Sequence, residues 1–217
     1  MDGLRLLGAG READVYAMAD GRVLRRYRDG SDATAEAELM AFVAAHGFPV
    51  PTVHTADGAE LVMELLDGPT MAGAVGSGAL DARAAGRMLA DLHNRLHAVP
   101  TQPGSDPSDR VVHLDLHPEN VVIVARGPVV IDWRNATQGS PDLDVALAAL
   151  ILAQVAVDDD LRAVMVQPLL AEFLAQVDRD PVRRLDDAVR RRGADANITA
   201  TERDQLPDAA SLVRATA

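Results

Sequence analysis

The 217-residue chain has a net charge of −12, 48% hydrophobic residues and no cysteine. This hydrophobic content is enough for a sizeable core, whereas the lack of cysteine excludes disulfides and thiolate metal sites. The acidic balance argues against a general nucleic-acid binder, and no apolar run approaches the roughly 18 residues of a membrane span. Since the N-terminus lacks a signal-peptide pattern, we expect a cytoplasmic protein with neither nucleic-acid nor membrane partners.

Residues 1–66 are predicted to form short strands with one helix. Asp20-Gly21 and Asp57-Gly58 each separate two short apolar runs, a spacing typical of β-hairpins. Between the two hairpins, residues 31–32 offer a Ser or Asp N-cap for a helix. The apolar residues at helical spacing in that segment are Ala35, Leu39, Met40 and Val43.

Residues 67–217 are predicted to be mainly helical. An amphipathic helix is expected from about Asp81 to His97, and further helices from Asp142 onward, on either side of two short strands. Because strands do not alternate regularly with helices, a doubly wound sheet is not expected. The sequence thus predicts an α+β chain with a β-rich unit, 1–66, and a helical unit, 67–217.

The most informative segment is His-Leu-Asp-Leu-His-Pro-Glu-Asn at 113–120, which is followed by the two short strands and by Ile-Asp-Trp at 131–133. It places Asn120 five residues after Asp115, and Asp132 twelve residues further on. Amide and carboxylate oxygens at this spacing, on both sides of a hairpin, suit a hard cation such as Mg²⁺. The first aspartate could contact an acceptor hydroxyl.

The pattern His-x-Asp-x-x-x-x-Asn, apolar hairpin, Ile-Asp-Trp resembles the catalytic and metal-binding segments of the aminoglycoside phosphotransferase family, within the protein-kinase-like superfamily. Further segments agree with that family in the same order, from residue 4 to about residue 150. These segments are residues 8–10 with 13–16, 22–25, 36–40, 61–68, 92–93 and 141–144. Each is weak alone, and their joint order makes the resemblance specific.

The resemblance implies a two-lobed protein-kinase-like fold. It also implies ATP- or GTP-dependent transfer of the γ-phosphate to a hydroxyl of a small molecule, such as an aminoglycoside-like or other cationic acceptor. In this family pattern Asp115 is the catalytic residue, and Asn120 and Asp132 hold Mg²⁺. The implied nucleotide-binding residues are Gly8, Gly10, Arg25, Glu36, Met63, Glu64 and Leu65.

The sequence departs from the family pattern in three ways. Arg25 stands where the family usually has a phosphate-binding lysine, and the chain contains no lysine. Because side chains alternate along a strand, Arg25 should point inward and pair with Glu36, while Arg26 points to solvent. Leu114 replaces the glycine common between His and Asp. Only 65 residues follow Leu152, so the acceptor side should be reduced or built differently.

Two other functions use the same residues. A kinase-like module that binds nucleotide without transfer is favoured by the missing lysine, but it leaves the Asp-Asn-Asp set unexplained. A metallohydrolase with His113, Asp115 and His117 as ligands needs a strand, yet Pro118 follows at once and a further histidine motif is not evident. The Gly-x-Gly-x-x-Ala run at 8–13 lacks the helix that a dinucleotide fingerprint requires.

Overall fold

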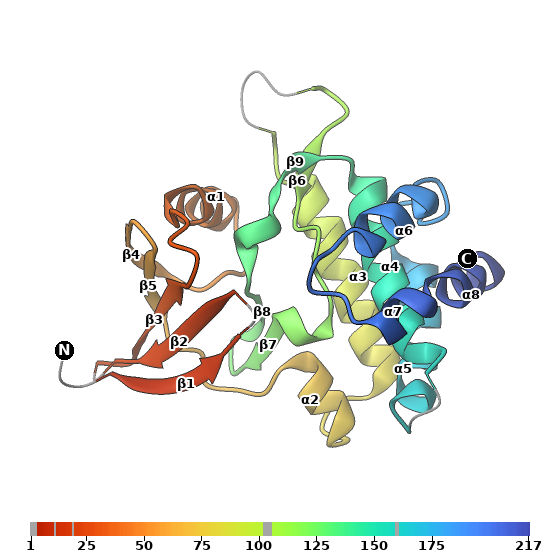
Figure 1. Ribbon diagram of the computed structural model, residues 1–217, viewed down its shortest axis with the longest axis horizontal. Helices are drawn as coiled ribbons and strands as arrows, with labels where there is room; N and C mark the ends of the chain where they lie inside the picture. The colour runs from red at the N-terminus through yellow and green to blue at the C-terminus, as the bar shows by residue number, and fades with distance from the viewer. Residues whose placement is uncertain (1–3, 11, 19, 102–105, 159–160) are drawn as a thin grey trace.

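The computed structural model describes residues 4–10, 12–18, 20–101, 106–158 and 161–217. An antiparallel five-stranded sheet and a body of helices lie on opposite sides of two short two-stranded sheets (Figure 1). The sheet has the order β1-β2-β3-β5-β4, with strands β1 (Arg5–Ala9), β2 (Ala13–Ala17), β3 (Arg22–Tyr27), β4 (Val53–Asp57) and β5 (Glu60–Glu64). The expected α+β class is confirmed, and the division of the chain after residue 66 stays a prediction.

Turn chemistry and side-chain alternation shape the sheet. Gly21 and Gly58 adopt positive φ angles of 76° and 52°, which glycine tolerates without strain, and each lies in a predicted hairpin turn. The central strand β3 buries Val23, Arg25 and Tyr27, which share one face because side chains alternate. A charged residue is therefore buried among apolar ones.

Helix α1 (Thr34–Ala45) begins later than predicted. Its N-cap is Ala33 and has no side-chain capping bond, so the cap expected at 31–32 is wrong. Asp32 instead accepts hydrogen bonds from the Thr34 N–H (2.8 Å) and hydroxyl (2.6 Å) in a turn before the helix. The buried residues of the helix are Glu36, Ala37, Met40 and Val43, without the predicted Ala35.

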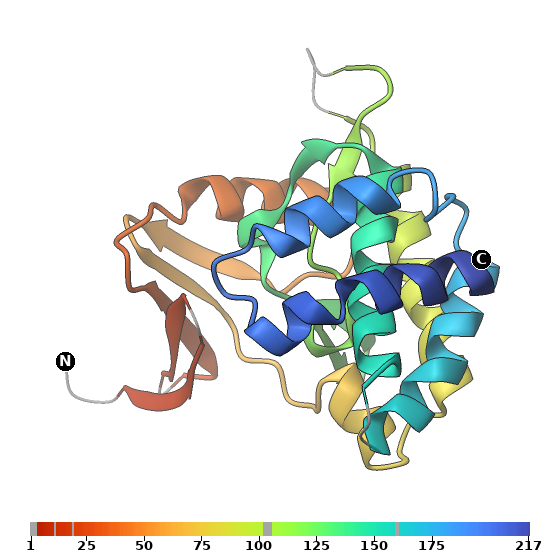
Figure 2. The ribbon, with the colours of Figure 1, turned by 45° about the vertical axis from the view of Figure 1, so that its right-hand side comes forward.

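The helical part is built around α4, which packs against α5, α6 and α8 (Figure 2). The helices are α2 (Met71–Gly76), α3 (Ala82–Ala98), α4 (Pro141–Ala156), α5 (Leu161–Gln176), α6 (Leu185–Gly193), α7 (Ala200–Asp204) and α8 (Leu206–Thr216). α4 is apolar around most of its circumference, as expected for a helix enclosed by others. Within the described ranges, no helix is both long and apolar enough to cross a membrane.

Two two-stranded sheets, of which β7–β8 is a hairpin, and two short 3₁₀ helices lie between the five-stranded sheet and the helices. Strand β6 (Arg110–Val112) pairs with β9 (Thr137–Gly139), and β7 (Val121–Val124) pairs with β8 (Gly127–Val130). The 3₁₀ helix η1 (Pro118–Asn120) precedes β7, and η2 (Trp133–Asn135) follows β8. The predicted catalytic and metal-binding residues thus flank the β7–β8 hairpin.

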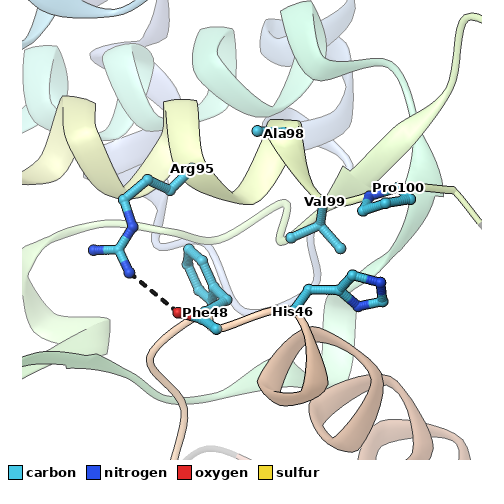
Figure 3. A pocket seen from close by; sticks show the side chains of 7 residues that line it. His46, Phe48, Arg95, Ala98, Val99 and Pro100 are labelled. Atoms are coloured by element: carbon cyan, nitrogen blue, oxygen red, sulfur yellow. Dashed lines mark hydrogen bonds between the residues drawn. The ribbon is translucent and has the colours of Figure 1, made fainter.

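The C-terminal ends of α1 and α3 also meet (Figure 3). Arg95 donates a hydrogen bond to the Gly47 carbonyl (Nη2 to O, 3.3 Å), and its guanidinium carbon lies 6.0 Å from the centre of the Phe48 ring. A hollow of about 220 Å³ lies beside these residues and is also lined by His46 and Val99. This contact joins the segment after α1 to the helical part.

Candidate active site

A cleft with a volume of about 1080 Å³ lies between the sheet and the helical part. Its walls come from the sheet, from the β7–β8 hairpin with the segments on either side of it, and from helices α4, α5, α6 and α7. The predicted site residues that line it are Gly10, Arg25, Met63, Glu64, Leu65, Asp115, Asn120 and Asp132. Gly8 and Glu36 are not part of the lining.

Arg25 bridges two acidic residues from distant parts of the chain. Its Nη1 lies 3.2 Å from Glu36 Oε1, and its Nη2 donates to Asp132 Oδ1. Burial alone would lower the pKa of Arg25, but the charges of Asp132 and Glu36 raise it, so the guanidinium stays protonated. The Arg25–Glu36 ion pair expected from the strand register is present, whereas the contact with Asp132 was not predicted.

Glu36, which does not line the cleft, fixes the position of the Arg25 guanidinium. Its carboxylate also accepts hydrogen bonds from the Tyr27 hydroxyl and from the Trp133 N–H, the latter at 3.1 Å. Burial raises the pKa of Glu36, and the Arg25 charge and the Tyr27 hydrogen bond oppose that shift. Because both carboxylate oxygens are already engaged, Glu36 acts on the cleft through Arg25.

Arg26 points away from Arg25, as predicted. It is half-exposed, its Nε donates to Glu60 Oε1 at 2.8 Å, and its guanidinium carbon lies 5.6 Å from the centre of the Tyr16 ring. Arg26 is also absent from the residues that line the cleft. The two neighbouring arginines therefore occupy different environments.

Asp115 is held by its own loop. Asn120 Nδ2 donates to the Asp115 carbonyl at 2.9 Å and to Asp115 Oδ2 at 3.1 Å, and His117 Nε2 lies 3.5 Å from Asp115 Oδ1. Burial would raise the pKa of Asp115, but the His117 hydrogen bond and the charges of His117, His113 and Arg192 lower it below its usual value. Asp115 is therefore an ionised hydrogen-bond acceptor at neutral pH.

Asp144 of α4 holds the loop that carries Asp115 through a hydrogen bond to its backbone, a role that the sequence did not reveal. Its Oδ1 accepts a hydrogen bond from the Leu114 N–H at 2.6 Å, and its Oδ2 lies 2.8 Å from His97 Nε2 and 3.5 Å from His93 Nδ1. Although burial acts to raise the pKa of Asp144, its interactions with His93 and His97 lower that pKa far below its usual value. His93 in turn contacts the Leu116 carbonyl at 3.3 Å.

The histidines do not form the alternative hydrolase site. His113 is fully buried, contacts the Ile131 carbonyl at 3.1 Å and packs edge-on against Trp133. Among the described residues, the group close enough to share an ion is His93, His97 and Asp144, without His113. That group already forms the hydrogen-bonded support of the loop, so the metallohydrolase interpretation is not supported.

Two non-glycine residues of the site have left-handed backbone conformations. Leu114 has a φ of 63° and Asp132 a φ of 65°. Such angles cost a leucine roughly 1–2 kcal/mol, whereas aspartate tolerates them better. The positive φ angle at position 114 explains why glycine is common there in the family that the sequence resembles.

The residues expected to bind Mg²⁺ fit that ion by their position and chemistry. The Ile131 N–H donates to the Asn120 carbonyl at 3.0 Å, which places Asn120 and Asp132 on neighbouring chain segments. Asn120 Nδ2 is engaged with Asp115, so its Oδ1 is the atom that can meet a cation. One amide oxygen and one carboxylate, without nitrogen or sulfur donors, suit a hard cation.

The end of β5 and the residues after it only partly match the nucleotide-binding residues expected from the sequence. The Glu64 carboxylate binds Arg126 through both oxygens, at 2.5 and 2.8 Å, which lowers its pKa and ties β5 to the β7–β8 turn. The Leu65 N–H donates to the Gly21 carbonyl at 3.1 Å. In the described chain, the Leu66 N–H has no hydrogen-bond partner, so it is the backbone donor left for a ligand here.

Gly68, just after this segment, must be glycine. A Cβ at this position would lie 2.0 Å from the Ile123 carbonyl oxygen of β7. The Ile123 N–H donates to the Pro69 carbonyl at 2.9 Å in the same crossing. The chain therefore passes tightly over β7 as it leaves the sheet.

Of the two N-terminal glycines, only Gly10 contributes to the cleft. Its N–H donates to the Ala13 carbonyl at 2.9 Å, and a Cβ would lie 3.1 Å from that oxygen. Gly8 lies within β1, opposite Val15 and after an irregularity in the pairing, and a Cβ there would meet no atom within 4 Å. Arg11, in the expected phosphate-covering loop, lies outside the described residues.

The far side of the cleft, called the acceptor end below, was not anticipated. Its charged and apolar residues are Leu147, Ile151 and Val155 of α4, Arg162 of α5, Arg191 and Arg192 of α6, Asp195 after α6, and Glu202 of α7. The run Arg190–Arg192 looks in the sequence like the favourable charge of a helix C-terminus, and α6 does end at Gly193. Only the packing of α6 beside α4 reveals that two of these arginines reach the cleft.

The arrangement of sheet, cleft and helical body defines a protein-kinase-like fold, which solved structures share. An ethanolamine kinase of Plasmodium vivax aligns with a TM-score of 0.67 and 11% identity, covering 100% of this chain and 85% of that one. A streptomycin–ATP complex of APH(2")-IIa gives 0.60 and 14%, covering 88% and 83%. An amicoumacin kinase with AMP-PNP, Ca²⁺ and Ami gives 0.59 and 13%, covering 99% and 88%.

The family follows from the sequence itself. Residues 3–110 and 101–185 match the family model described as Phosphotransferase enzyme family (APH). The chain therefore belongs to this phosphotransferase family, and the resemblance seen in the sequence is confirmed. No curated protein matches the sequence significantly.

Proposed function

We propose that the protein transfers the γ-phosphate of ATP or GTP to a hydroxyl group of a small molecule. The observation that carries the proposal is that Arg25, Asp115, Asn120 and Asp132 line one cleft. Together they supply a cation for phosphate, an acceptor for a hydroxyl proton and oxygens for Mg²⁺. Membership of the family and the ATP and AMP-PNP complexes of two structural neighbours support nucleotide use.

The nucleotide base would bind at the apolar part of the cleft. Val15 and Val23 from the sheet and Val122 and Ile131 from the β7–β8 hairpin line it from two sides. Such walls suit a flat heteroaromatic ring, and the Leu66 N–H adds a directional hydrogen-bond donor. The phosphates would then extend toward Arg25.

Arg25, Asn120 and Asp132 would organise the phosphates. The Arg25 guanidinium is fixed by Glu36, so it can bind phosphate oxygens without losing much side-chain freedom. Asn120 and Asp132 would hold Mg²⁺, which neutralises phosphate charge when bound. Because Asp132 also contacts Arg25, the same carboxylate links the two positive charges.

Asp115 would orient the acceptor. Its ionised carboxylate accepts the hydrogen bond of the acceptor hydroxyl, whose oxygen forms a new bond to the γ-phosphorus. The bond from the γ-phosphorus to the β,γ-bridging oxygen breaks, and the nucleoside diphosphate leaves with that electron pair. The hydroxyl proton passes to Asp115 and then to solvent. The hydrogen bonds from Asn120 and His117 hold the carboxylate in position for this step.

An aminoglycoside-like acceptor was expected from the family resemblance, and a cationic acceptor in general is favoured only by the net charge of −12. Total charge influences association with ligands but does not define a binding site. The family and its neighbours therefore support a small-molecule acceptor in general.

The rival function is nucleotide binding without transfer, and Asp115→Asn separates the two. We expect the wild type to bind ATP or GTP only with Mg²⁺ in isothermal titration calorimetry, and the variant to bind equally well. Phosphate transfer, measured by ³¹P NMR with a panel of hydroxylated metabolites and antibiotics, should fall by about 10²-fold or more in the variant. Absence of nucleotide binding, or unchanged transfer by the variant, would contradict the proposal.

A further inference from the structure

The carboxylates of the acceptor end are already neutralised by the protein. Arg192 lies 3.4 Å from Glu202 and 3.7 Å from Asp195, and its Nε donates to Gln154 Oε1 at 3.2 Å. Glu202 also completes the capping box of α7. These acids are therefore engaged in holding α6 and α7 together and offer little to a cationic ligand.

The other two acids that line the cleft, apart from the site aspartates and Glu64, are likewise engaged. Glu12 lies 3.2 Å from Arg134 Nε and accepts from Asn197 Nδ2 at 3.3 Å. Glu119 accepts from the Thr70 hydroxyl at 3.1 Å, on the side of the cleft next to α2. A polycationic acceptor needs several uncommitted carboxylates, and the acceptor end does not supply them.

Arg191, unlike these acidic residues, is not engaged by other groups of the described chain. It lines the cleft, it is exposed, and within the described ranges it forms no ion pair or hydrogen bond. Arg191, the neighbouring Arg192 and Asp115 line the same cleft. The end of α6 therefore presents an uncommitted cation near the predicted transfer site.

The wall next to these arginines is apolar. Leu147, Ile151 and Val155 are spaced four residues apart and so lie on one face of α4. Leu114, which immediately precedes Asp115, also lines the cleft. An apolar surface beside a cation suits a ligand with a hydrocarbon or ring body and an anionic end.

We propose that the acceptor is a hydroxylated molecule with an apolar body and a carboxylate or similar anion, which binds against the α4 wall with its anion at Arg191. This inference rests on the proposed phosphotransfer and specifies its substrate class. It replaces the cationic acceptor suggested by whole-chain charge, because the uncommitted charge at the acceptor end has the opposite sign.

Two series of acceptors test this proposal, and the members of each series share one apolar body and carry an anionic, a neutral or a cationic end group. One is 4-(hydroxymethyl)benzoate, its methyl ester and 4-(aminomethyl)benzyl alcohol; the other is 8-hydroxyoctanoate, 1,8-octanediol and 8-aminooctan-1-ol. Wild-type protein with Mg²⁺ and ATP or GTP is expected to phosphorylate the anionic member of at least one series. Its kcat/KM should exceed that of the neutral member about tenfold, the scale of one charge-assisted hydrogen bond.

The matched variants are Arg191→Glu and Arg190→Glu, which make the same charge change on adjacent residues of α6. Arg190 pairs with Asp187 and does not line the cleft. Only Arg191→Glu should abolish the preference for the anion, while nucleotide affinity stays unchanged in both. Preference for the cationic member, equal effects of both variants, or no phosphorylation of any of the six compounds would overturn the inference. If the wild-type protein binds no nucleotide, that result would instead refute the phosphotransferase proposal itself.

Discussion

Arg25 stands where the family usually has a lysine, but it makes contacts that a lysine would not make in the same way. A lysine ammonium is one compact charge, whereas the Arg25 guanidinium uses separate nitrogens for Glu36 and Asp132. This fork links the helix behind the sheet to the predicted metal-binding aspartate. The substitution therefore adds a contact that a lysine in the same place would make less easily.

We expect Arg25→Ala to weaken Mg²⁺–nucleotide binding at least about tenfold, since a charge-assisted hydrogen bond contributes about 1.5–3 kcal/mol. Arg26→Ala, which removes the same side chain from the opposite face, should change the Kd less than about twofold because exposed ion pairs contribute about 0–1 kcal/mol. Isothermal titration calorimetry compares the two.

Loss of Arg25 also leaves Glu36 buried without its cation, so Arg25→Ala could unfold the protein. Arg25→Lys keeps a positive charge and serves as the folded alternative. We expect it to bind nucleotide better than Arg25→Ala and to keep the thermal midpoint closer to that of the wild type. Equal affinity for Arg25→Lys, Arg26→Ala and a folded Arg25→Ala would contradict a phosphate-binding role.

Leu114 offers a direct measurement of backbone strain. Leu114→Gly and Leu114→Ala remove nearly the same apolar surface, but only glycine adopts a φ of 63° without cost. We expect the glycine variant to be the more stable of the two by about 0.5–1 kcal/mol in urea unfolding. At the exposed α1 position Ala35, the change to glycine should instead destabilise by a similar amount. The opposite order at position 114 would exclude strain there.

At the scale of elements, the packing of α3 against α5 depends on a single missing side chain. A Cβ on Gly86 of α3 would lie 2.4 Å from the Leu169 carbonyl oxygen and 3.1 Å from the Phe173 nitrogen, both backbone atoms of α5. Backbone atoms within a helix cannot move aside separately, so the helices would have to separate.

We therefore expect Gly86→Ala to destabilise the protein by about 1–3 kcal/mol, as overpacking does. Gly76→Ala at the end of α2 is the control, because a Cβ there meets no atom within 4 Å. That variant should be neutral or gain up to about 1 kcal/mol from helix propensity. Denaturant midpoints at constant m-value distinguish them, and equal midpoints would show that α3 and α5 can adjust.

At the scale of the whole molecule, buried histidines make stability depend on pH. Burial lowers the pKa of His97, against the opposing effect of Asp144, and burial also lowers that of His113. In the unfolded chain both would titrate near about 6.5. The unfolded state therefore binds more protons below that pH, and stability falls as the pH drops through it.

We expect the free energy of unfolding to decrease between pH 7.5 and 5.5, with a slope of up to about 1.4 kcal/mol per pH unit for each proton. His97→Gln should flatten this slope, whereas His54→Gln at an exposed position of β4 should not. Glu36, whose pKa burial raises, acts in the opposite direction at lower pH, so the slopes of the variants are compared. Identical slopes for the two variants would rule out His97 as a contributor.

Local sequence patterns were enough to predict which charged side chains of the sheet and of α1 face inward. Strand alternation separated Arg25 from Arg26, and helical spacing turned Glu36 inward, because both depend on neighbours only a few residues away. The order of Asp115, Asn120 and Asp132 was equally readable, since a short hairpin connects them. The family assignment followed from the same linear pattern.

Tertiary structure alone decided the remaining features. The left-handed backbone of Leu114 and its hydrogen bond to Asp144 join segments 30 residues apart, and no local signal marks either. The arginines of α6 looked like ordinary helix-end charges until packing against α4 turned Arg191 toward the cleft. Long-range packing determines which charges are neutralised and which stay available, so the sequence determined the residues of the proposed reaction site, while the fold determined the charge and polarity of the proposed acceptor end.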